Sequence, residues 1–323
     1  MAWVNPSWSA EFSAKRIYRE VSPKVVLITA FEPGQKYQGV GTGSIIREDG
    51  LVLTNAHVVF NSRTQQPYSK LRIFLKPQRL TGDLQSDTAR KFKATLLKYS
   101  KDLDLAVLMI EADNKPASLP FIKFTDSNTV EIGERVLAIG HPESGGLWTL
   151  TTGSISSHIK NFQKISGKDV FQTEVSLNRG NSGGPLLDGQ GSMVGINSNI
   201  ARRSSDGLAI TDINFSIKAN VAVKWLNSEG YDFHLETAAV DMDEPSSGHA
   251  MSPTTDFSDS RTEDAGIKAI PRTKSGKQTK PRPVKPQILT PKRPYKMTDL
   301  FKQVENEMED MMDDIRQKLK RRR

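Results

Sequence analysis

The sequence contains no cysteine in its 323 residues, which excludes disulfide bonds, a thiol nucleophile and metal sites built from thiolates. No apolar run approaches the ~20 residues that a membrane-spanning helix requires. The first residues, MAWVNPSWSAEF, lack the basic and apolar regions of a secretory signal. As written, the sequence predicts a cytoplasmic protein, or an exported one if a signal has been removed.

Apolar residues make up only 36% of the sequence, which is low for a globular protein. The formal charge of +8 is unevenly placed: residues 236–265 carry eight acids and one arginine, whereas residues 266–296 carry ten lysines or arginines and six prolines. Both stretches lack periodicity and cannot bury enough apolar surface to offset the entropy of ordering. We therefore expect a disordered linker over residues 236–296, acidic at first and then basic.

Residues 19–235 contain many short apolar runs that are separated by turn signals. The runs include VVLITAF, LRIFL and RVLAIG, and the pairs Asp49-Gly50, Asp188-Gly189 and Asp206-Gly207 are typical of hairpin turns. Helical periodicity is scarce over this range. The pattern predicts one all-β region, built as a sandwich or as barrels.

The two ends of the sequence differ from this body. Residues 297–323 predict an amphipathic C-terminal helix with Thr298 as its N-cap. Its apolar residues could form a short coiled-coil seam or pack on the body of the protein; they are Phe301, Val304, Met308, Met311 and Ile315. Residues 1–18 form an N-terminal arm with four aromatic side chains: Trp3, Trp8, Phe12 and Tyr18.

The segment NRGNSGGPL places Ser182 between glycines. Two unrelated enzyme designs use such a serine as a nucleophile, and an ordinary tight turn has the same composition. One of these designs, the nucleophile elbow of α/β-hydrolases, requires a helix after the serine, with an acid and a histidine later in the sequence. The residues that follow, PLLDGQGSMVGINS, are typical of a hairpin, which disfavours the elbow. A glycine turn with a solvated serine stays open on this segment alone.

Two upstream motifs supply the groups that would activate a serine. TNAHVV places His57 after an apolar strand, and DLDLAVL places Asp104 at the start of another, with Asp102 as a rival acid. An imidazole can take the proton of the serine hydroxyl, and a carboxylate on the far ring nitrogen fixes the tautomer. Glycines beside the serine let backbone N–H groups turn toward a developing oxyanion.

In this order and spacing, TNAHVV, DLAVL and GNSGGPL resemble the HtrA/Deg family of serine proteases. The segment TDSNTVEIGERVLAIGHPESGGLWTLTTGSIS and QTEVSLNRGNSGG extend the resemblance, although Glu174 stands where the family usually has Asp. The resemblance covers roughly Ile17 to Leu226. It implies the chymotrypsin-like double β-barrel and a catalytic triad of His57, Asp104 and Ser182; Asp104 is preferred because the family places its acid directly before the L-A-V-L strand.

The resemblance also implies further site residues. Oxyanion donors are expected at the backbone N–H groups of Gly180 and Ser182, helped by Asn181. The pocket for the residue before the cut is expected to be lined by Ser176, Leu177, Ser198, Asn199, Ile200 and Phe215 or Ile217. Because Ser176 is not a carboxylate, a small or medium apolar side chain is expected there. No His, Asp or Glu cluster has metal-ligand spacing, so we expect neither a metal nor another cofactor.

Asn181 also bears on activation, because it cannot form the ion pair with a new N-terminus that switches on trypsin-type zymogens. Family members typically continue into PDZ domains, and no PDZ-like set of strands is found in the 93 residues after Gly230.

The predicted function is a serine endopeptidase that acts on polypeptides in protein quality control or processing. The alternative is a protease-fold peptide-binding or scaffold protein with little activity. In the resembled family an aromatic N-terminal segment packs between subunits, which predicts a homo-oligomer, with a trimer favoured. The basic linker could contact an anionic partner or act as a solvated spacer. The family resemblance favours a periplasmic or otherwise exported location.

Overall fold

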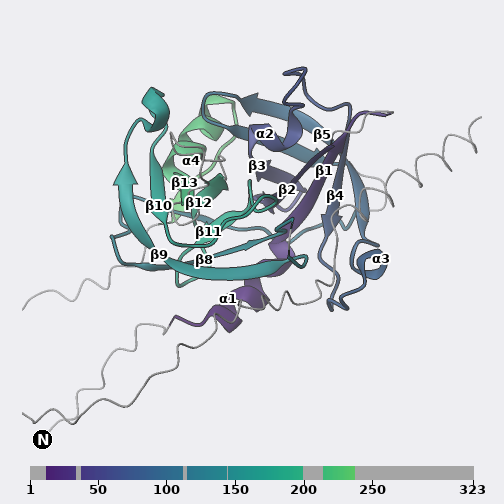
Figure 1. Ribbon diagram of the computed structural model, residues 1–323, viewed down its shortest axis with the longest axis horizontal. Helices are drawn as coiled ribbons and strands as arrows, with labels where there is room; N and C mark the ends of the chain where they lie inside the picture. Colours follow the sequence, from purple (N-terminus) through teal and green to yellow (C-terminus); the bar gives the residue numbers. More distant parts are fainter. Residues whose placement is uncertain (1–11, 34–37, 112–114, 144, 199–213, 237–323) are drawn as a thin grey trace, which may run out of the picture. The chain divides into compact units, whose positions relative to one another are not determined.

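The computed structural model describes residues 12–33, 38–111, 115–143, 145–198 and 214–236. Strands dominate this part of the chain and form two barrels (Figure 1). The expected chymotrypsin-like double β-barrel is confirmed. The expected linker over residues 236–296 lies outside the described residues except for Glu236, and the C-terminal helix lies outside them altogether.

The first barrel is closed by six strands in the order β1-β2-β3-β6-β5-β4. All neighbours are antiparallel, and Gly50, with φ +93°, makes the predicted Asp-Gly turn between the second and third strands. The strands are β1 Val25–Phe31, β2 Gln38–Ile45, β3 Leu51–Thr54, β4 Lys70–Leu75, β5 Lys91–Ser100 and β6 Leu105–Ile110; the short helices α2 Ala56–Val59 and α3 Leu84–Asp87 lie between them.

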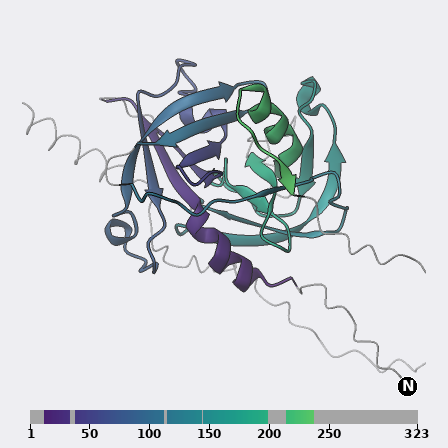
Figure 2. The same cartoon turned by 180° about the vertical axis from the view of Figure 1, so that it is seen from behind.

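The second barrel contains six strands in the ring β11-β8-β9-β10-β13-β12, which the pairing of β11 with β12 closes. The two-residue strands β7 and β14 extend the sheet in parallel beside β12. The elements are β7 Phe124–Thr125, β8 Arg135–Gly140, β9 Thr149–Ile159, η2 Phe162–Lys164, β10 Val170–Thr173, β11 Pro185–Leu187, β12 Met193–Ser198, β13 Asn214–Lys218, α4 Ala219–Ser228 and β14 Leu235–Glu236. Helix α4 packs on β12, β13 and β7 (Figure 2).

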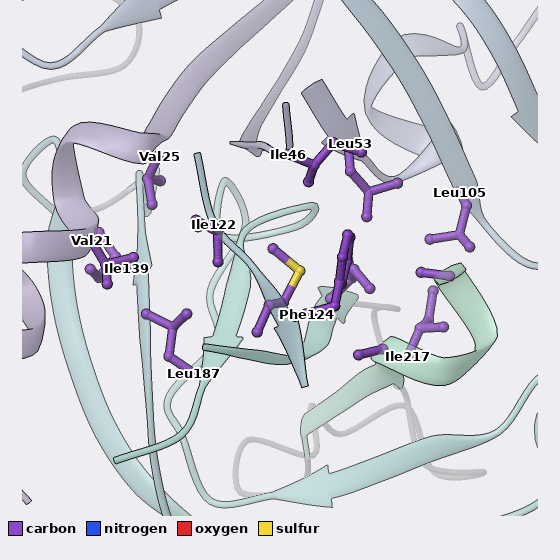
Figure 3. Close-up of a cluster of buried hydrophobic side chains, with 14 of the residues drawn as sticks. Val21, Val25, Ile46, Leu53, Leu105, Ile122, Phe124, Ile139, Leu187 and Ile217 are labelled. Carbon is purple, nitrogen blue, oxygen red and sulfur yellow. The ribbon is translucent and has the colours of Figure 1, made fainter. Parts of the chain in front are cut away.

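Alternating side chains of the same strand supply two different cores. In β1, Val26 and Ile28 fill the first barrel, whereas Leu27 belongs to the cluster that both barrels share. Figure 3 shows this shared cluster, to which Leu53 and Leu105 of the first barrel and Leu187 and Ile217 of the second all belong. Because each fully buried aliphatic side chain contributes roughly 1.5–3 kcal/mol, the shared cluster holds the barrels together.

Helix α1, Ala14–Val21, leads into the short helix η1, Ser22–Lys24, and then into β1. Ile17 and Val21, one turn apart, are buried against the barrels, and the Arg16 guanidinium donates to the Gly189 carbonyl at 2.8 Å. The expected boundary after residue 18 is therefore wrong, because it cuts this helix. Phe12 packs under Arg135, and Tyr18 donates to the Trp148 carbonyl at 2.9 Å, so both aromatics contact their own barrels. Trp3 and Trp8 lie outside the described residues.

Candidate active site

His57 lies in the single turn of α2, directly after β3. Asn55, which precedes this turn, donates from its side chain to the Asp104 carbonyl at 2.9 Å and so ties the turn to the start of β6. The His57 side chain keeps 43% of its surface exposed. A substrate can therefore reach the imidazole, although the backbone of His57 is held by its contacts with β3 and the start of β6.

Asp104 adopts a left-handed backbone conformation with φ +59°, which is uncommon for a residue with a side chain. Its carboxylate accepts the His57 ring Nδ1 at 2.9 Å and the His57 backbone N–H at 3.0 Å. The Ser198 hydroxyl donates to the same carboxylate at 2.9 Å. Because an ionised carboxylate only accepts hydrogen bonds, Nδ1 of His57 donates in this contact, and Nε2 of the neutral ring then has a lone pair.

The rival acid, Asp102, is exposed and does not contribute its carboxylate to this network. Its backbone carbonyl instead accepts the ammonium of the buried Lys168 at 2.8 Å. Burial lowers the pKa of Lys168, and the carboxylates of Asp104 and Asp102 oppose this shift. The geometry therefore assigns the histidine partner to Asp104.

Ser182 lies in the loop between β10 and β11, and the residue is only 4% exposed. Its carbonyl accepts the Thr42 backbone N–H at 2.8 Å, so a strand of the first barrel holds this loop of the second. Gly183 has φ +83°, and a side chain there would collide with the Thr54 hydroxyl and the Thr42 carbonyl. The loop that carries Ser182 thus packs against the end of β3 at Thr54, three residues before His57.

The backbone N–H groups of the predicted oxyanion donors, Gly180, Asn181 and Ser182, do not all have the same surroundings. The Asn181 backbone N–H donates to the Asn178 carbonyl at 3.0 Å, and the Asn181 side-chain oxygen lies beside Gly140. The Asn181 N–H is thus already used within the loop and its side chain points inward, so a contribution of Asn181 to the oxyanion site stays a prediction. Gly180 has φ +97°, and the carbonyl before it, that of Arg179, accepts the Glu143 N–H at 2.6 Å. The Gly180 N–H faces the opposite way, because a trans peptide points its C=O and N–H to opposite sides.

Several residues of the expected specificity pocket have other roles. Leu177 packs in the interior of the second barrel, and Ile217 is a core residue that is only 1% exposed. Phe215 packs against Phe162, with the rings tilted and 4.4 Å between their centroids. Ser198 binds Asp104, Ser176 is exposed, and Asn199 and Ile200 lie outside the described residues. Leu177 and Ile217 therefore pack in the core, and their part in the pocket stays a prediction.

A cavity of about 210 Å³ that the sequence did not predict adjoins the imidazole. The Lys101 ammonium caps it, lying 4.7 Å from the centroid of the Phe60 ring and donating to the Gln65 carbonyl at 2.8 Å. The lining residues are Ala56, His57, Phe60, Ser62, Gln65, Lys101 and Asp104. Ala56, His57 and Asp104 belong to the motifs TNAHVV and DLDLAVL, but no motif marks the other four residues.

Two polar residues behind the serine loop also have no sequence signal. Thr42 and His141 are both fully buried, and burial lowers the pKa of His141 to about 3. His141 therefore stays neutral at physiological pH and is not a second base. Within the described ranges, no three His, Asp or Glu side chains gather closely enough to hold a metal ion. Among those same residues, no helix has the length and apolar character needed to cross a membrane.

Comparisons with known proteins agree with this arrangement. Residues 41–196 match the family model of the trypsin-like peptidase domain, a range that contains His57, Asp104 and Ser182. A probable periplasmic serine endoprotease, DegP-like, from Hahella chejuensis is 34% identical over 60% of this chain and 36% of its own length. The chloroplastic Protease Do-like 1 of Arabidopsis thaliana is also 34% identical, over 64% of this chain and 45% of its own length.

A solved structure described as the HtrA-type protease AlgW with tripeptide has the same fold. It aligns with a TM-score of 0.54 and 28% identity, over 67% of this chain and 63% of that one. The present chain spans less than half the length of the two curated relatives named above. On the double-barrel fold, the family model and these relatives, residues 41–196 form a trypsin-like peptidase domain that is similar to those of HtrA-type serine proteases.

Proposed function

We propose that this protein is a serine endopeptidase in which Ser182 is the nucleophile, His57 the general base and Asp104 the acid that orients it. The observation that carries the proposal is the pairing of Asp104 with Nδ1 of His57, which leaves Nε2 as the base. The glycine loop of Ser182, packed against the strand that leads to His57, supports the same assignment. The similarity to proteins named serine endoproteases supports the reaction class.

The proposed reaction uses these groups in two halves. His57 Nε2 takes the Ser182 proton as the hydroxyl oxygen attacks the peptide carbonyl carbon, and the N–H groups of Gly180 and Ser182 stabilise the oxyanion. The imidazolium then gives its proton to the leaving amine as the C–N bond breaks. A water molecule attacks the acyl-enzyme with the same base, which releases the carboxylic acid and restores Ser182. Asp104 stays ionised throughout and stabilises the imidazolium.

The proposed substrates are polypeptides that are cut after a small or medium apolar residue, in protein quality control or processing. The solved HtrA-type neighbour is described with a tripeptide, which supports a peptide substrate class. The exposed Ser176 leaves the pocket entrance without a carboxylate that could pair with Arg or Lys. We also propose an exported location, since relatives are named as periplasmic, and a homo-oligomeric state with a trimer favoured. A contact of the basic linker with an anionic partner stays a prediction, because that linker lies outside the described residues.

Casein digestion by the wild-type protein and by Ser182→Ala tests the activity. We expect the wild type to cleave casein, the variant to be inactive with unchanged thermal unfolding, and a phosphonofluoridate to label Ser182 alone in mass spectrometry. If the wild-type protein binds casein without cutting it, and the phosphonofluoridate does not react, the scaffold alternative replaces the protease.

A further inference from the structure

Thr42 contacts both carbonyl groups that flank Asn181. Its backbone N–H donates to the Ser182 carbonyl at 2.8 Å, and its side-chain hydroxyl donates to the Gly180 carbonyl at 2.6 Å. Thr42 belongs to β2 of the first barrel, whereas the loop belongs to the second barrel. One residue therefore sets the orientation of two consecutive stretches of backbone in the proposed oxyanion loop.

The hydrogen bonds of Thr42 define the protonation of His141. A threonine hydroxyl has one proton, and here it goes to the Gly180 carbonyl, which can only accept. The Thr42 oxygen must then accept from its other two neighbours, the His141 backbone N–H at 3.2 Å and the His141 Nδ1 at 3.0 Å. Nδ1 of His141 therefore carries the proton, and Nε2 does not as long as the ring is neutral.

Burial keeps this ring neutral. His141 is fully buried, which lowers its pKa to about 3. The groups that face it are the Thr42 hydroxyl, the indole of Trp148 and the backbone of Gly180, none of which is titratable in the usual range. Within the described residues, Nε2 has no hydrogen-bond partner, so the Thr42 contacts are the ones that orient the ring.

The segment of His141 also shapes the peptide bond that supplies the proposed donor. A side chain at Gly180 would collide with the His141 carbonyl, so this glycine is needed for the close approach of the two segments. Two residues later, the Glu143 N–H donates to the Arg179 carbonyl at 2.6 Å. These contacts fix the plane of the Arg179–Gly180 peptide and direct its N–H away from residue 143.

Trp148 connects this arrangement to the N-terminal helix. Its ring meets the His141 ring edge to face at 4.7 Å, and its indole N–H donates to the Val25 carbonyl at 2.8 Å. Trp148 has φ +50°, which is costly for an aromatic residue unless its surroundings hold it. The Tyr18 hydroxyl of α1 donates to the Trp148 carbonyl at 2.9 Å and is one of the contacts that hold it.

We propose that Thr42 and neutral, Nδ1-protonated His141 are positioning residues that hold the Gly180 N–H in its active orientation, and that Tyr18 supports them through Trp148. This inference rests on the proposed function only where it predicts a change in kcat. In this arrangement, neutral hydrogen bonds take the place of the ion pair that Asn181 cannot form. These hydrogen bonds exist without any cleavage of the chain. The N-terminal helix thereby becomes part of the support of the active site.

The protonation of His141 can be tested without any activity measurement. In long-range ¹H–¹⁵N spectra of the full chain labelled at histidine nitrogens, with His141→Asn used to assign the signal, we expect a neutral ring with Nδ1 protonated from about pH 5 to 8. Thr42→Val, which removes the acceptor but keeps the shape, should shift this signal, and Thr42→Ser should restore it. A ring protonated at Nε2, or one that titrates near its ordinary pKa, overturns the proposal.

The kinetic test separates positioning from stability. Because loss of an oxyanion donor costs about 10²–10³ in kcat, a disturbed donor in Thr42→Val should lower kcat about 10- to 100-fold. KM should stay nearly unchanged, because the lost interaction is made only in the transition state. Thr42→Ser should retain nearly full activity. Equal losses in both variants, or a loss that follows the fraction of unfolded protein, contradict the proposal.

Tyr18→Phe tests the link to α1. This change removes one hydroxyl and should lower kcat by a few-fold, whereas Tyr231→Phe, a matched loss of a phenolic hydroxyl away from these contacts, should not. Unchanged kcat in Tyr18→Phe removes α1 from the proposal. If the wild-type protein cleaves nothing, the proposed protease function fails, and the spectrum of His141 still decides whether the hydrogen-bond arrangement is right.

Discussion

The Ser198 hydroxyl and the Asp104 carboxylate lie 2.9 Å apart, although they belong to different barrels. Ser198 ends β12 of the second barrel, whereas Asp104 precedes β6 of the first. The proposed catalytic acid is therefore fixed by its own barrel through His57 and Asn55 and by the opposite barrel through Ser198. A carboxylate held from both sides keeps its histidine in one tautomer and one orientation.

This network predicts opposite results for two neighbouring aspartates. Asp104→Asn should lower kcat by about 10⁴, because an amide favours the wrong histidine tautomer. Asp102→Asn should leave activity within a few-fold of the wild type, because Asp102 contributes only its backbone carbonyl. Peptide hydrolysis measures both, with circular dichroism to check the fold. An inactive Asp102→Asn beside an active Asp104→Asn would reverse the assignment of the acid.

The specificity prediction concerns the residue before the cut. The position that would bind Arg or Lys in trypsin-like enzymes is Ser176, which is exposed and uncharged. We expect Val, Ala, Ile or Leu at that place in the substrate, as measured by cleavage of a peptide library and sequencing of the products. A dominant preference for Arg or Lys would show that the substrate side chain enters another part of the surface.

His141 predicts how stability depends on pH. Its pKa is about 3 in the folded protein, against ~6.5 in an unfolded chain. Between these values only the unfolded chain binds the proton, so the free energy of unfolding falls with falling pH by up to about 1.4 kcal/mol per unit. This contribution is absent above pH ~6.5, where neither state binds the proton.

Urea unfolding of the wild type and of His141→Asn between about pH 5 and 8 checks this prediction. The variant should be less stable at neutral pH but should lose less stability on acidification. His234→Asn is the control, because the His234 side chain is 80% exposed. Parallel curves for the wild type and His141→Asn would mean that the ring is hydrated or charged in the folded protein.

Comparing Gly183 of the serine loop with Gly133, which lies in the turn before β8, separates backbone strain from steric collision. Gly133 and Gly183 both have left-handed backbones, at φ +91° and +83°, but only Gly183 has atoms in the space of a side chain. Gly133→Ala should cost about 1–2 kcal/mol from the backbone alone. Gly183→Ala should cost about 2–5 kcal/mol, because overpacking adds to the strain. Thermal unfolding measures both, and equal losses would show that the loop can move away from Thr54.

The predicted assembly can be tested with the structure of α1 in view. A chain that starts at Glu11 keeps Phe12, the Ser13 cap and the whole helix, but lacks Trp3 and Trp8. If the aromatic arm holds a trimer, light scattering should show the full chain as a trimer at micromolar concentration and this shortened chain as a monomer. A chain that ends at Val240 should stay trimeric. Dissociation of only the latter would assign the assembly to the C-terminal segment, and a monomeric full chain would exclude the trimer.

The fold and the central site residues were accessible from the sequence for a physical reason. Strand ends place polar residues at a barrel edge, so the local pattern of TNAHVV and DLDLAVL marks His57, Asp102 and Asp104 as candidates. The choice of Asp104 over Asp102 came from the family resemblance. The apolar runs VVLITAF and RVLAIG coincide with β1 and β8. Short helices were harder, since α1 carries only two buried side chains, Ile17 and Val21, within an aromatic segment.

The remainder of the site depends on contacts between distant segments. Leu177 and Ile217 are apolar residues near the serine loop, and nothing in the sequence distinguishes a pocket wall from a core position. Thr42 and His141 are 99 residues apart, and their hydrogen bond exists only because the two barrels meet. Such pairs have no spacing rule, because the distance between them is set by tertiary packing.

The placement of the proposed catalytic groups on both barrels has a consequence for biosynthesis. A growing polypeptide that has emerged only through β6 contains the imidazole and the carboxylate, but neither the nucleophile nor Ser198 has been translated. Ser182 follows 72 residues after the end of β6 at Ile110, and β13 must still be added before the second ring can close. In the proposed protease, peptide cleavage therefore begins only after the second barrel has been translated, and a half-made molecule does not yet contain the nucleophile that could digest its neighbours.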